Sequence, residues 1–525
     1  MAQSRESDAR RDHVRLLHRL DRRRSLALAA VVGVLAGFVA VGFQKAIELA
    51  ERTSSGLASN FGHSGLGLLG LVASTACLGG AAGYITERYC PEAAGSGIPH
   101  VKEVLVGARV LRPVRLMAVK LVGGFLAIAA GMSLGREGPT IHMGAASGEL
   151  FGRWARVPKR TRKALVSAGA GAGLAAAFNA PLAGFLFVME ELKREMSPVT
   201  YGTALVASVA SVAVTRIVLG QQSNFQLADP PPVPLHDLPI VALVGVAGAV
   251  CGVLFNKGLL AGLELRSRFR VPRWVAGASV GALTGLAIIF YPMITGPGHG
   301  VAESILAGTL PNQGLISVVA LLLVGKIICT ILSYDTGAPG GIFTPLLVIG
   351  SVAGLLVGDF CHLVIPTYTP DPRVLATVGM AAIMSGSVRA PLTAVVLIVE
   401  MTGQYHLLYA LLLAAFIADV LADLVHDHPI YEALMDRDLN QTHHEAENEE
   451  DLLEILVEPN SRLEGVKLRS LKMPSGCLVA VVAREGRNFA PSGATELMAG
   501  DILTMVVSPG VDRRTVVDLV EQARA

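Results

Sequence analysis

Two charged residues stand side by side in the stretch GMSLGREGPTIHMG, residues 131–144, which is otherwise rich in glycine and apolar side chains. Arg136 and Glu137 lie between two glycines, with apolar sequence on both sides. A charge at the centre of a membrane costs roughly 2.5 to 3.5 kcal/mol on insertion scales, so such residues mark pathways for ions or protons. A plain salt bridge is the alternative, but adjacent residues on a helix do not face each other.

A second pair of carboxylates, Glu190 and Glu191, ends a long apolar stretch. Lys193 and Arg194 follow directly and indicate that this end lies at the cytoplasmic face. A carboxylate in this position can admit protons from the cytoplasm, or it can simply solvate the end of a helix. The residues alone leave both interpretations open.

Three motifs that contain glycine and proline predict helices beginning after a break: GSGIP at 95–99, GREGP at 135–139 and GGIFTP at 340–345. A helix N-terminus exposes unpaired N–H groups and about half a positive charge. Several such ends meeting at the membrane centre would bind an anion without the full charge that would hold it too tightly. Any one motif could merely kink a packed helix. The three together favour an anion site.

The elements that must position these residues are membrane helices. Of 525 residues, 52% are hydrophobic and 16% are charged, whereas a soluble domain carries about 25% charged residues. Apolar stretches of about the length of a membrane span recur as far as residue 425. We therefore predict a polytopic α-helical membrane protein. Its expected spans lie near 26–43, 65–86, 115–134, 202–219, 239–264, 274–291, 315–332 and 405–424.

Basic residues set the expected orientation in the membrane. The first 24 residues hold eight arginines, and two further basic loops lie at 153–163 and 266–273. By the positive-inside rule these segments are cytoplasmic. A signal peptide is disfavoured because no small-residue cleavage site follows the first apolar run. We expect a multi-pass protein of the cell (inner) membrane with both termini in the cytoplasm.

The membrane part contains an internal repeat, because FNAPLAGFLFVMEE at 178–191 aligns with VRAPLTAVVLIVEM at 388–401. Glu190 and Glu400 are partners in this alignment, 210 positions apart. Two halves with matching interrupted segments indicate a transporter fold whose substrate site lies at the repeat interface. The predicted halves cover about 26–220 and 239–435.

The predicted domain order is a cytoplasmic segment at 1–25, a membrane domain at 26–435, a polar linker at 436–451 and a small α/β domain at 452–525. In this last domain the sequence predicts a hairpin turning at Glu485-Gly486, a further strand in GDILTMVVSP and a terminal amphipathic helix at 511–525. About 70 residues bury only a modest core, so we expect this domain to dimerise or dock.

Six cysteines are scattered without metal or redox spacing, so we expect no disulfide and no metal. The sequence also gives no reason to expect a cofactor or a nucleic-acid partner. An intramembrane hydrolase is disfavoured, because Ser96 has no histidine and acid in a recognisable spacing and no HExxH motif occurs. We therefore expect a transporter and not an enzyme.

The three glycine motifs, together with FNAPLAG at 178–184 and SVRAPLT at 387–393, resemble the CLC chloride channels and proton-coupled chloride transporters. The resemblance covers about residues 26–435 in the family's motif order. It implies inverted-topology repeats with broken and re-entrant helices, and a homodimer in which each subunit has its own anion pathway.

The resemblance also implies roles for particular residues. Glu137 matches the external gating glutamate, and Glu191 matches the internal proton glutamate, whereas Glu190 is expected to be structural. Arg136 and Lys120 are expected to give long-range positive support without touching the anion. The residues implied to bind chloride are Ser96, Gly97, Ile342, Phe343 and Tyr431. Serine at position 96 favours chloride, since nitrate-preferring members tend to have proline there. Asp335, near the third motif, is expected to cap the next helix or else to tune anion entry.

The C-terminal segment resembles the RCK-C, or TrkA-C type, regulatory domain, through EPNSRLEGVKLRSL and the later AGDIL. The resemblance implies dimerisation and binding of a small cytosolic ligand such as a nucleotide. A purely structural dimer clamp is an open alternative.

The expected function is exchange of chloride for protons, because both a gating and an internal glutamate are present. A passive voltage- or pH-gated chloride channel of the same fold is the alternative. A membrane-bound sensor is disfavoured, because the sequence lacks kinase and receiver motifs.

Overall fold

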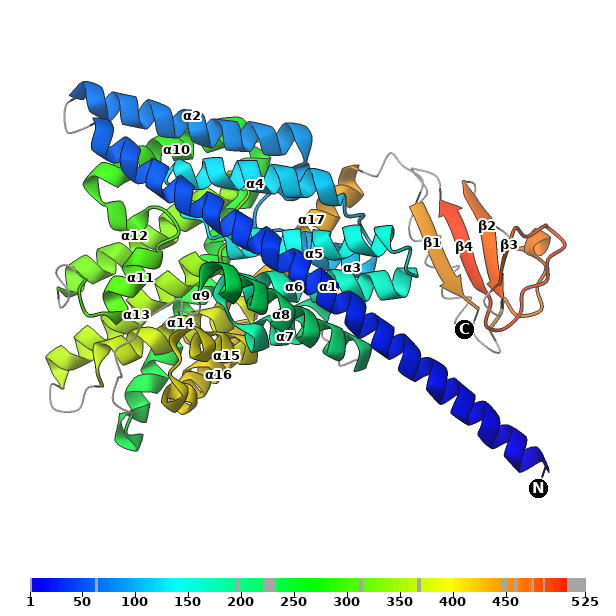
Figure 1. The fold of residues 1–525 in the computed structure, drawn as a ribbon. Helices are drawn as coiled ribbons and strands as arrows, with labels where there is room; N and C mark the ends of the chain where they lie inside the picture. Colours follow the sequence, from blue (N-terminus) through cyan, green and yellow to red (C-terminus); the bar gives the residue numbers. More distant parts are fainter. Residues whose placement is uncertain are drawn as a thin grey trace. The chain divides into compact units, whose positions relative to one another are not determined.

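The computed structural model describes residues 2–61, 65–193, 198–220, 233–310, 315–365, 370–445, 451–457, 461–471, 473, 476–484 and 487–507. The chain divides into two compact units, Met1–Leu434 and Met435–Ala525. The first is almost entirely helical, and the second contains the strands (Figure 1).

The first half of the membrane unit runs from α1 to α8. Its elements are α1 (Ala2–Phe61), α2 (Gly65–Tyr89), α3 (Ile98–Val106), α4 (Pro113–Ala129), α5 (Glu137–Trp154), α6 (Lys159–Phe178), α7 (Pro181–Phe187), the π-helix η2 (Val188–Lys193) and α8 (Pro198–Leu219). The second half repeats this order of long and short helices. Its elements are α9 (Leu238–Arg268), α10 (Arg273–Phe290), α11 (His299–Leu306), α12 (Ile316–Asp335), α13 (Phe343–Val364), α14 (Pro372–Val388), α15 (Pro391–Thr402) and α16 (Leu408–Leu424). The helix α17 (Ile430–Glu445) follows.

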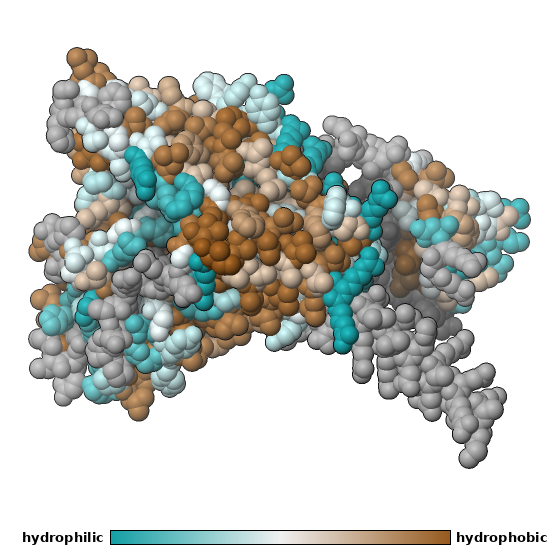
Figure 2. Space-filling model, in the orientation of Figure 1, coloured by the Kyte–Doolittle hydropathy of each residue, from teal (hydrophilic) through white to brown (hydrophobic). Residues whose placement is uncertain are grey.

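The described residues hold eight helices long and apolar enough to cross a membrane. Seven of them overlap the expected spans. The prediction at 115–134 is wrong in detail, because α4 has only 17 residues and ends at Ala129. Phe343–Val364 is a long apolar helix that the expected spans omitted. One face of the molecule has apolar side chains over its middle, as lipid contact requires (Figure 2).

Glycines let the helices in each half pack with their backbones in contact. A Cβ at Gly144 of α5 would collide with the carbonyl oxygen of Gly169 on α6. A Cβ at Gly350 of α13 would collide in the same way with Gly379 on α14. Such close approach is typical of small residues at membrane helix interfaces. The two pairs occupy matching places in the two halves, which explains part of the high glycine content.

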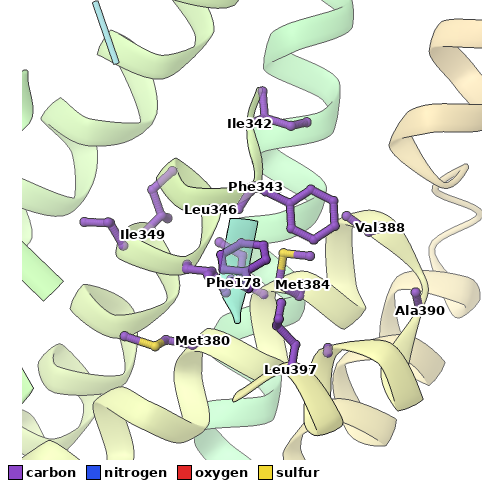
Figure 3. Close-up of a cluster of buried hydrophobic side chains, with 14 of the residues drawn as sticks. Phe178, Ile342, Phe343, Leu346, Ile349, Met380, Met384, Val388, Ala390 and Leu397 are labelled. Atoms are coloured by element: carbon purple, nitrogen blue, oxygen red, sulfur yellow. The ribbon is translucent and has the colours of Figure 1, made fainter. Parts of the chain in front are cut away.

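The core behind the glycine motifs is apolar and includes Phe178, Phe343, Met380 and Met384 (Figure 3). The rings of Phe178 and Phe343 have centroids 6.1 Å apart. Phe343 is the first residue of α13. The start of α13 is therefore anchored by packing.

The second unit contains a four-stranded antiparallel sheet in the order β1-β4-β2-β3. The strands are β1 (Asp451–Leu456), β2 (Cys477–Arg484), β3 (Arg487–Phe489) and β4 (Ile502–Val507). Its small core contains Ile455, Val482, Leu503 and Met505. The predicted hairpin strands and the strand in GDILTMVVSP are confirmed. The predicted turn at Glu485-Gly486 and the helix at 511–525 lie outside the described residues. The segment expected as a linker is helical as far as Glu445.

Candidate functional site

The three glycine motifs lie against one another, although they are far apart in the sequence. Gly95 donates its N–H to Ala338 O at 3.2 Å and accepts a hydrogen bond from Gly340 N at 3.0 Å. Gly135 and Gly341 exchange two backbone hydrogen bonds of 2.6 and 2.7 Å. The segments that lead into α3, α5 and α13 are therefore tied together. Each of these helices begins at its motif, as the sequence predicts.

The first turn of α5 packs directly on the other two motifs. A Cβ at Gly138 would lie 2.8 Å from Ser96 Cβ, and a Cβ at Gly341 would lie 2.8 Å from Gly138 N. Only glycine permits such approach at these positions. Gly97 precedes α3 in the left-handed conformation, with φ of +83°. Three helix N-termini thus converge, and their N–H groups form the kind of site that binds anions.

Glu137 is the first residue of α5, and its side chain is fully buried. Its carboxylate folds back over Gly135. A Cβ atom added to Gly135 would collide with Glu137 Oε2. Arg136 Nε lies 3.9 Å and His299 Nε2 lies 3.8 Å from Oε1. Neither carboxylate oxygen has a hydrogen-bond partner among the described residues. A buried acid held this loosely beside three helix N-termini can exchange places with an anion or take up a proton.

Ser96 and Tyr431 provide buried hydroxyl groups at the same place. Ser96 Oγ accepts the N–H of Ile98 at 3.3 Å. The Tyr431 ring stacks on Phe343, with centroids 6.1 Å apart and planes inclined by 17°. The Tyr431 hydroxyl has no hydrogen-bond partner among the described residues. It is therefore a donor available to a ligand.

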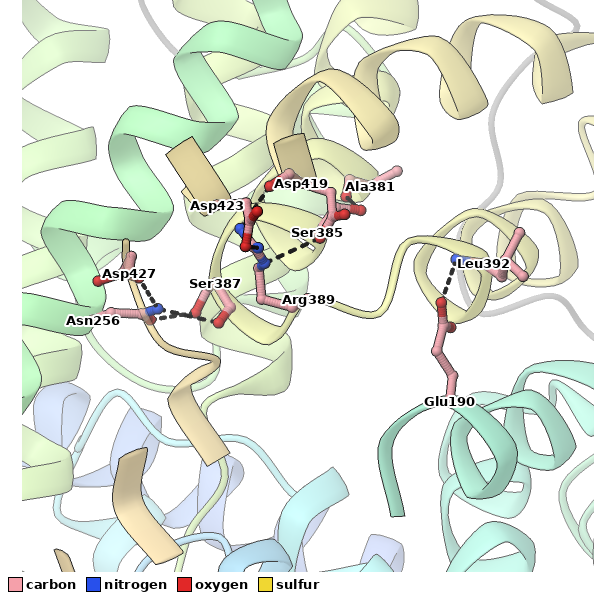
Figure 4. A network of polar contacts seen from close by, with 10 residues as sticks. All are labelled: Glu190, Asn256, Ala381, Ser385, Ser387, Arg389, Leu392, Asp419, Asp423 and Asp427. Atoms are coloured by element: carbon pink, nitrogen blue, oxygen red, sulfur yellow. Dashed lines mark hydrogen bonds and ion pairs between the residues drawn. The ribbon is translucent and has the colours of Figure 1, made fainter. Parts of the chain in front are cut away.

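Tyr431 is positioned by a polar network just before α17. Asn256 of α9 donates to Asp427 Oδ2 at 2.7 Å and to Ser387 O at 3.1 Å, and it accepts the Ser387 hydroxyl at 2.6 Å (Figure 4). This network fixes the loop that leads into α17 to the end of α14. Tyr431 lies in the first turn of α17, shortly after this loop.

Of the residues expected to bind chloride, the structure connects Ser96, Gly97, Ile342, Phe343 and Tyr431 through these contacts. Ile342 is the residue before α13 and is buried with Phe343. Gly97 packs against the ring of His142 on α5. Their placement is compatible with the expected site, and their binding of chloride remains a prediction.

Glu191 lies in the π-helix that follows α7. It is fully buried and forms an ion pair of 2.7 Å with Lys102 of α3. Lys102 Nζ also lies 3.8 Å from Glu432 on α17, whose side chain is 27% exposed. A chain of charged groups thus runs from a partly exposed carboxylate to a buried one. Lys102 was not predicted from the sequence, where a lone lysine in GSGIPHVKEVLV resembles an ordinary helix residue.

Glu190 and Glu400 each cap the start of a helix in the other half of the membrane unit. Glu190 accepts the backbone N–H of Leu392 at the start of α15 at 3.1 Å (Figure 4). It also accepts the N–H of Thr393 at 2.7 Å. Glu400 accepts those of Leu182 and Ala183 at the start of α7, at 3.1 and 2.9 Å. These contacts agree with the expectation that Glu190 is structural.

Two buried lysines occupy matching places in the halves. Lys120 donates to Gly95 O at 2.6 Å, and Lys326 donates to Gly296 O at 2.7 Å. Lys120 therefore supports the loop before α3 from behind. Asp335 is the last residue of α12, and a Cβ at Gly262 would collide with its carboxylate. Its expected role as a cap of the next helix, or in tuning anion entry, stays a prediction.

Comparisons with known proteins agree with this geometry. A family model described as voltage gated chloride channel matches residues 78–423, and a TrkA-C domain model matches residues 452–511. The H(+)/Cl(-) exchange transporter ClcA of Vibrio cholerae is 36% identical over 423 residues, 79% of this chain and 89% of its own. ClcA of Yersinia pseudotuberculosis is 32% identical over 422 residues, with 79% and 87% covered.

Solved structures show the same similarity. A slow cyanobacterial Cl⁻/H⁺ antiporter matches with a TM-score of 0.75 and 33% identity, over 80% of this chain and 99% of that one. A eukaryotic CLC transporter matches with a TM-score of 0.67 and 23% identity, over 80% and 74%. The second likeness concerns the fold alone.

Proposed function

The chain belongs to the voltage gated chloride channel family, and from this premise we propose that it exchanges chloride for protons across the membrane. The observation that carries the proposal is the buried Glu137 carboxylate at three converging helix N-termini. Such a site couples chloride to protons, because the Glu137 carboxylate must take up a proton or be displaced before chloride enters. The similar ClcA of Vibrio cholerae and the slow cyanobacterial antiporter are both exchangers of chloride and protons.

In the proposed mechanism chloride is held by backbone N–H groups of Ile342 and Phe343 and by the hydroxyls of Ser96 and Tyr431. These neutral donors stabilise an anion that has lost part of its water. None carries a full charge, so the anion can leave again.

Protons reach the transport cycle through a second buried carboxylate, that of Glu191. Glu191, paired with Lys102, receives protons that enter past the partly exposed Glu432. Because Glu191 is buried, it can pass a proton inward only when the Lys102 contact loosens or a water molecule intervenes. A channel has no need for this second buried acid, which is why exchange is favoured over passive conduction.

Purified protein in liposomes tests the proposal directly. An outward chloride gradient is imposed while the external and internal pH are equal, and both ions are followed. Exchange predicts that protons move uphill, driven by chloride, and that a proton ionophore dissipates the resulting pH difference. Chloride flux without any proton movement would establish a channel.

We also propose a homodimer of multi-pass subunits in the cell (inner) membrane, with both termini cytoplasmic. The membrane domain covers 26–435 and the regulatory domain 452–525, joined at 436–451. The regulatory domain binds a small cytosolic ligand, such as a nucleotide. A thermal-shift screen of the full chain against nucleotides, followed by flux measurements with each binder, tests this regulation, and deletion of 452–525 should abolish the shift.

A further inference from the structure

His299 faces Glu137 from the second half of the membrane unit. It is the first residue of α11, and its Nε2 atom lies 3.8 Å from Glu137 Oε1. In the first half the matching residue is Ile98, the first residue of α3, and each follows a left-handed glycine. The histidine is therefore not required by the shared backbone.

The same imidazole lines a pocket of about 410 Å³. The pocket is bounded by the far part of α1, the loop after α10 and the start of α11, and its lining includes Glu51, Ser55, Thr295, Gly298, Gly300 and Ser304. Ser55 and Gly300 are exposed. The His299 side chain is 22% exposed, whereas that of Glu137 is 0% exposed. His299 thus touches both the buried acid and a space that water can enter.

The pocket lies at the end of the helices opposite to the cytoplasmic loops. On α1, Glu51 and Ser55 lie beyond the apolar span that follows the arginine-rich start. On α10, the basic loop precedes Arg273 and the pocket residues follow Phe290. With the basic segments in the cytoplasm, both helices place the pocket at the external face. Glu191 of the Glu191–Lys102 pair lies in η2, which ends at Lys193, so the pair serves the other face.

The charges around the ring suit transient protonation. Arg136 of the α5 motif and Lys326 of α12 lie within electrostatic range of the imidazole, and Glu137 faces it. Glu51 of α1 lines the pocket and interacts with Glu303 of α11. The two cations disfavour a long-lived imidazolium beside Glu137, while Glu51 at the pocket attracts a departing proton.

We propose that His299 relays protons between Glu137 and the external pocket. When the protonated Glu137 re-ionises, its proton passes to Nε2 and forms imidazolium. The ring then gives one proton to water in the pocket and returns to the neutral form, so one proton leaves the acid and one enters the water. The 3.8 Å gap is longer than a hydrogen bond, and one bridging water or a small rotation of the Glu137 side chain closes it.

This inference rests on the proposed exchange, and the liposome assay separates the two. In His299→Gln, which keeps polarity but cannot shuttle a proton, we expect chloride-driven proton transport to fall at least about tenfold. Imidazole added to the pocket side should restore much of the rate, whereas imidazole on the other side should not. His362→Gln, an exposed histidine of α13, is the matched control and should transport protons normally.

A second comparison excludes a merely structural role. In a Glu137→Gln background no proton has to leave position 137, so adding His299→Gln should cause no further loss of chloride flux. An equal loss in both backgrounds would show that His299 only supports the fold, and undiminished proton transport in His299→Gln would refute the relay. Absence of proton movement in the unmodified protein would instead refute the exchange itself.

Discussion

The two halves of the membrane unit share a backbone plan but differ in the side chains that can bear protons. Glu137 begins α5, and the residue that begins α13 at the matching place is Phe343. Glu191 lies in η2, and its partner by the repeat alignment is Met401 in α15. One half therefore supplies the acids, and the other supplies apolar surface and helix N-termini at the same places.

The halves also differ in one piece of local backbone. After Pro181 the chain forms a short α-helix and then a π-helix, whereas after Pro391 the α-helix continues to Thr402. A π-helix is often found at functional sites because the extra residue in its turn redirects side chains. Here the redirected residue is Glu191, which reaches Lys102. The two halves therefore differ in backbone at the segment that holds Glu191.

The residues that support the fold, in contrast, have the same types in both halves. Lys120 and Lys326 each hold the loop before a short helix, and Glu190 and Glu400 each cap the other half. The comparison therefore separates residues that support the fold from residues that we propose to move ions. The following predictions test this separation.

The largest effect is expected at Glu137. Glu137→Gln should abolish proton transport while chloride flux continues and loses its dependence on pH, because the amide cannot release a proton. Flux of both ions in liposomes at several pH values measures this. His362→Gln, an exposed histidine of α13, is the control and should leave proton coupling intact. Persistent coupling in Glu137→Gln would contradict the gate assignment.

The next effect is expected at Glu191. Glu191→Gln should sharply reduce proton movement, and chloride flux should continue. Met401→Leu at the matching position should change neither. The same liposome assay measures both ions, and Glu190→Gln serves as a neighbouring control that should keep coupling. Loss of coupling in Glu190→Gln together with normal coupling in Glu191→Gln would reverse the roles of this pair.

The hydroxyl donors should affect selectivity more than coupling. Ser96→Pro should shift preference from chloride towards nitrate, since it removes a donor suited to a small spherical ion. Tyr431→Phe should weaken chloride binding by about tenfold or less, as expected for the loss of one hydrogen bond worth roughly 0.5 to 1.5 kcal/mol. Calorimetric titration with chloride and nitrate measures both. Unchanged affinity and selectivity in both variants would place the anion elsewhere.

Glu190 and Glu400, which support the fold, should affect stability by similar amounts in the two halves. Glu190→Gln and Glu400→Gln each weaken hydrogen bonds to two N–H groups at a helix start, and each should cost about 0.5 to 2 kcal/mol. Thermal unfolding in detergent should show similar decreases in Tm for the two variants. A large decrease for one and none for the other would break the proposed equivalence.

Local sequence patterns predicted those features that depend on neighbouring residues. The starts of α3, α5 and α13 follow from glycine and proline, and the strands β2 and β4 follow from runs of apolar residues. The contact of Lys102 with Glu191 spans 89 positions, and no local pattern indicates it. The π-helix and the approach of His299 to Glu137 likewise depend on tertiary packing. The expected spans omit α13, because its start belongs to a motif that indicates a broken helix, although the apolar run behind that start is long enough to cross a membrane.

The smallest effect on transport is expected in the second unit. Arg484 donates to both oxygens of Asp501 at 2.8 Å, and these hydrogen bonds, with one from Met498 N, hold the pKa of Asp501 below its ordinary value. Because the pKa is lowered on folding, the contribution of Asp501 to stability is fully present above the unfolded value of about 4 and is lost as the pH falls through the lower folded value. Hydrogen exchange of the β4 amides in the full chain should therefore show constant protection from pH 7 to about pH 5 and a decrease below about pH 4.

In Asp501→Asn that decrease should shrink, because the variant lacks the titrating group, and chloride flux at neutral pH should be unchanged. Exchange of β4 that depends on pH equally in both proteins would show that another group controls the stability of this domain.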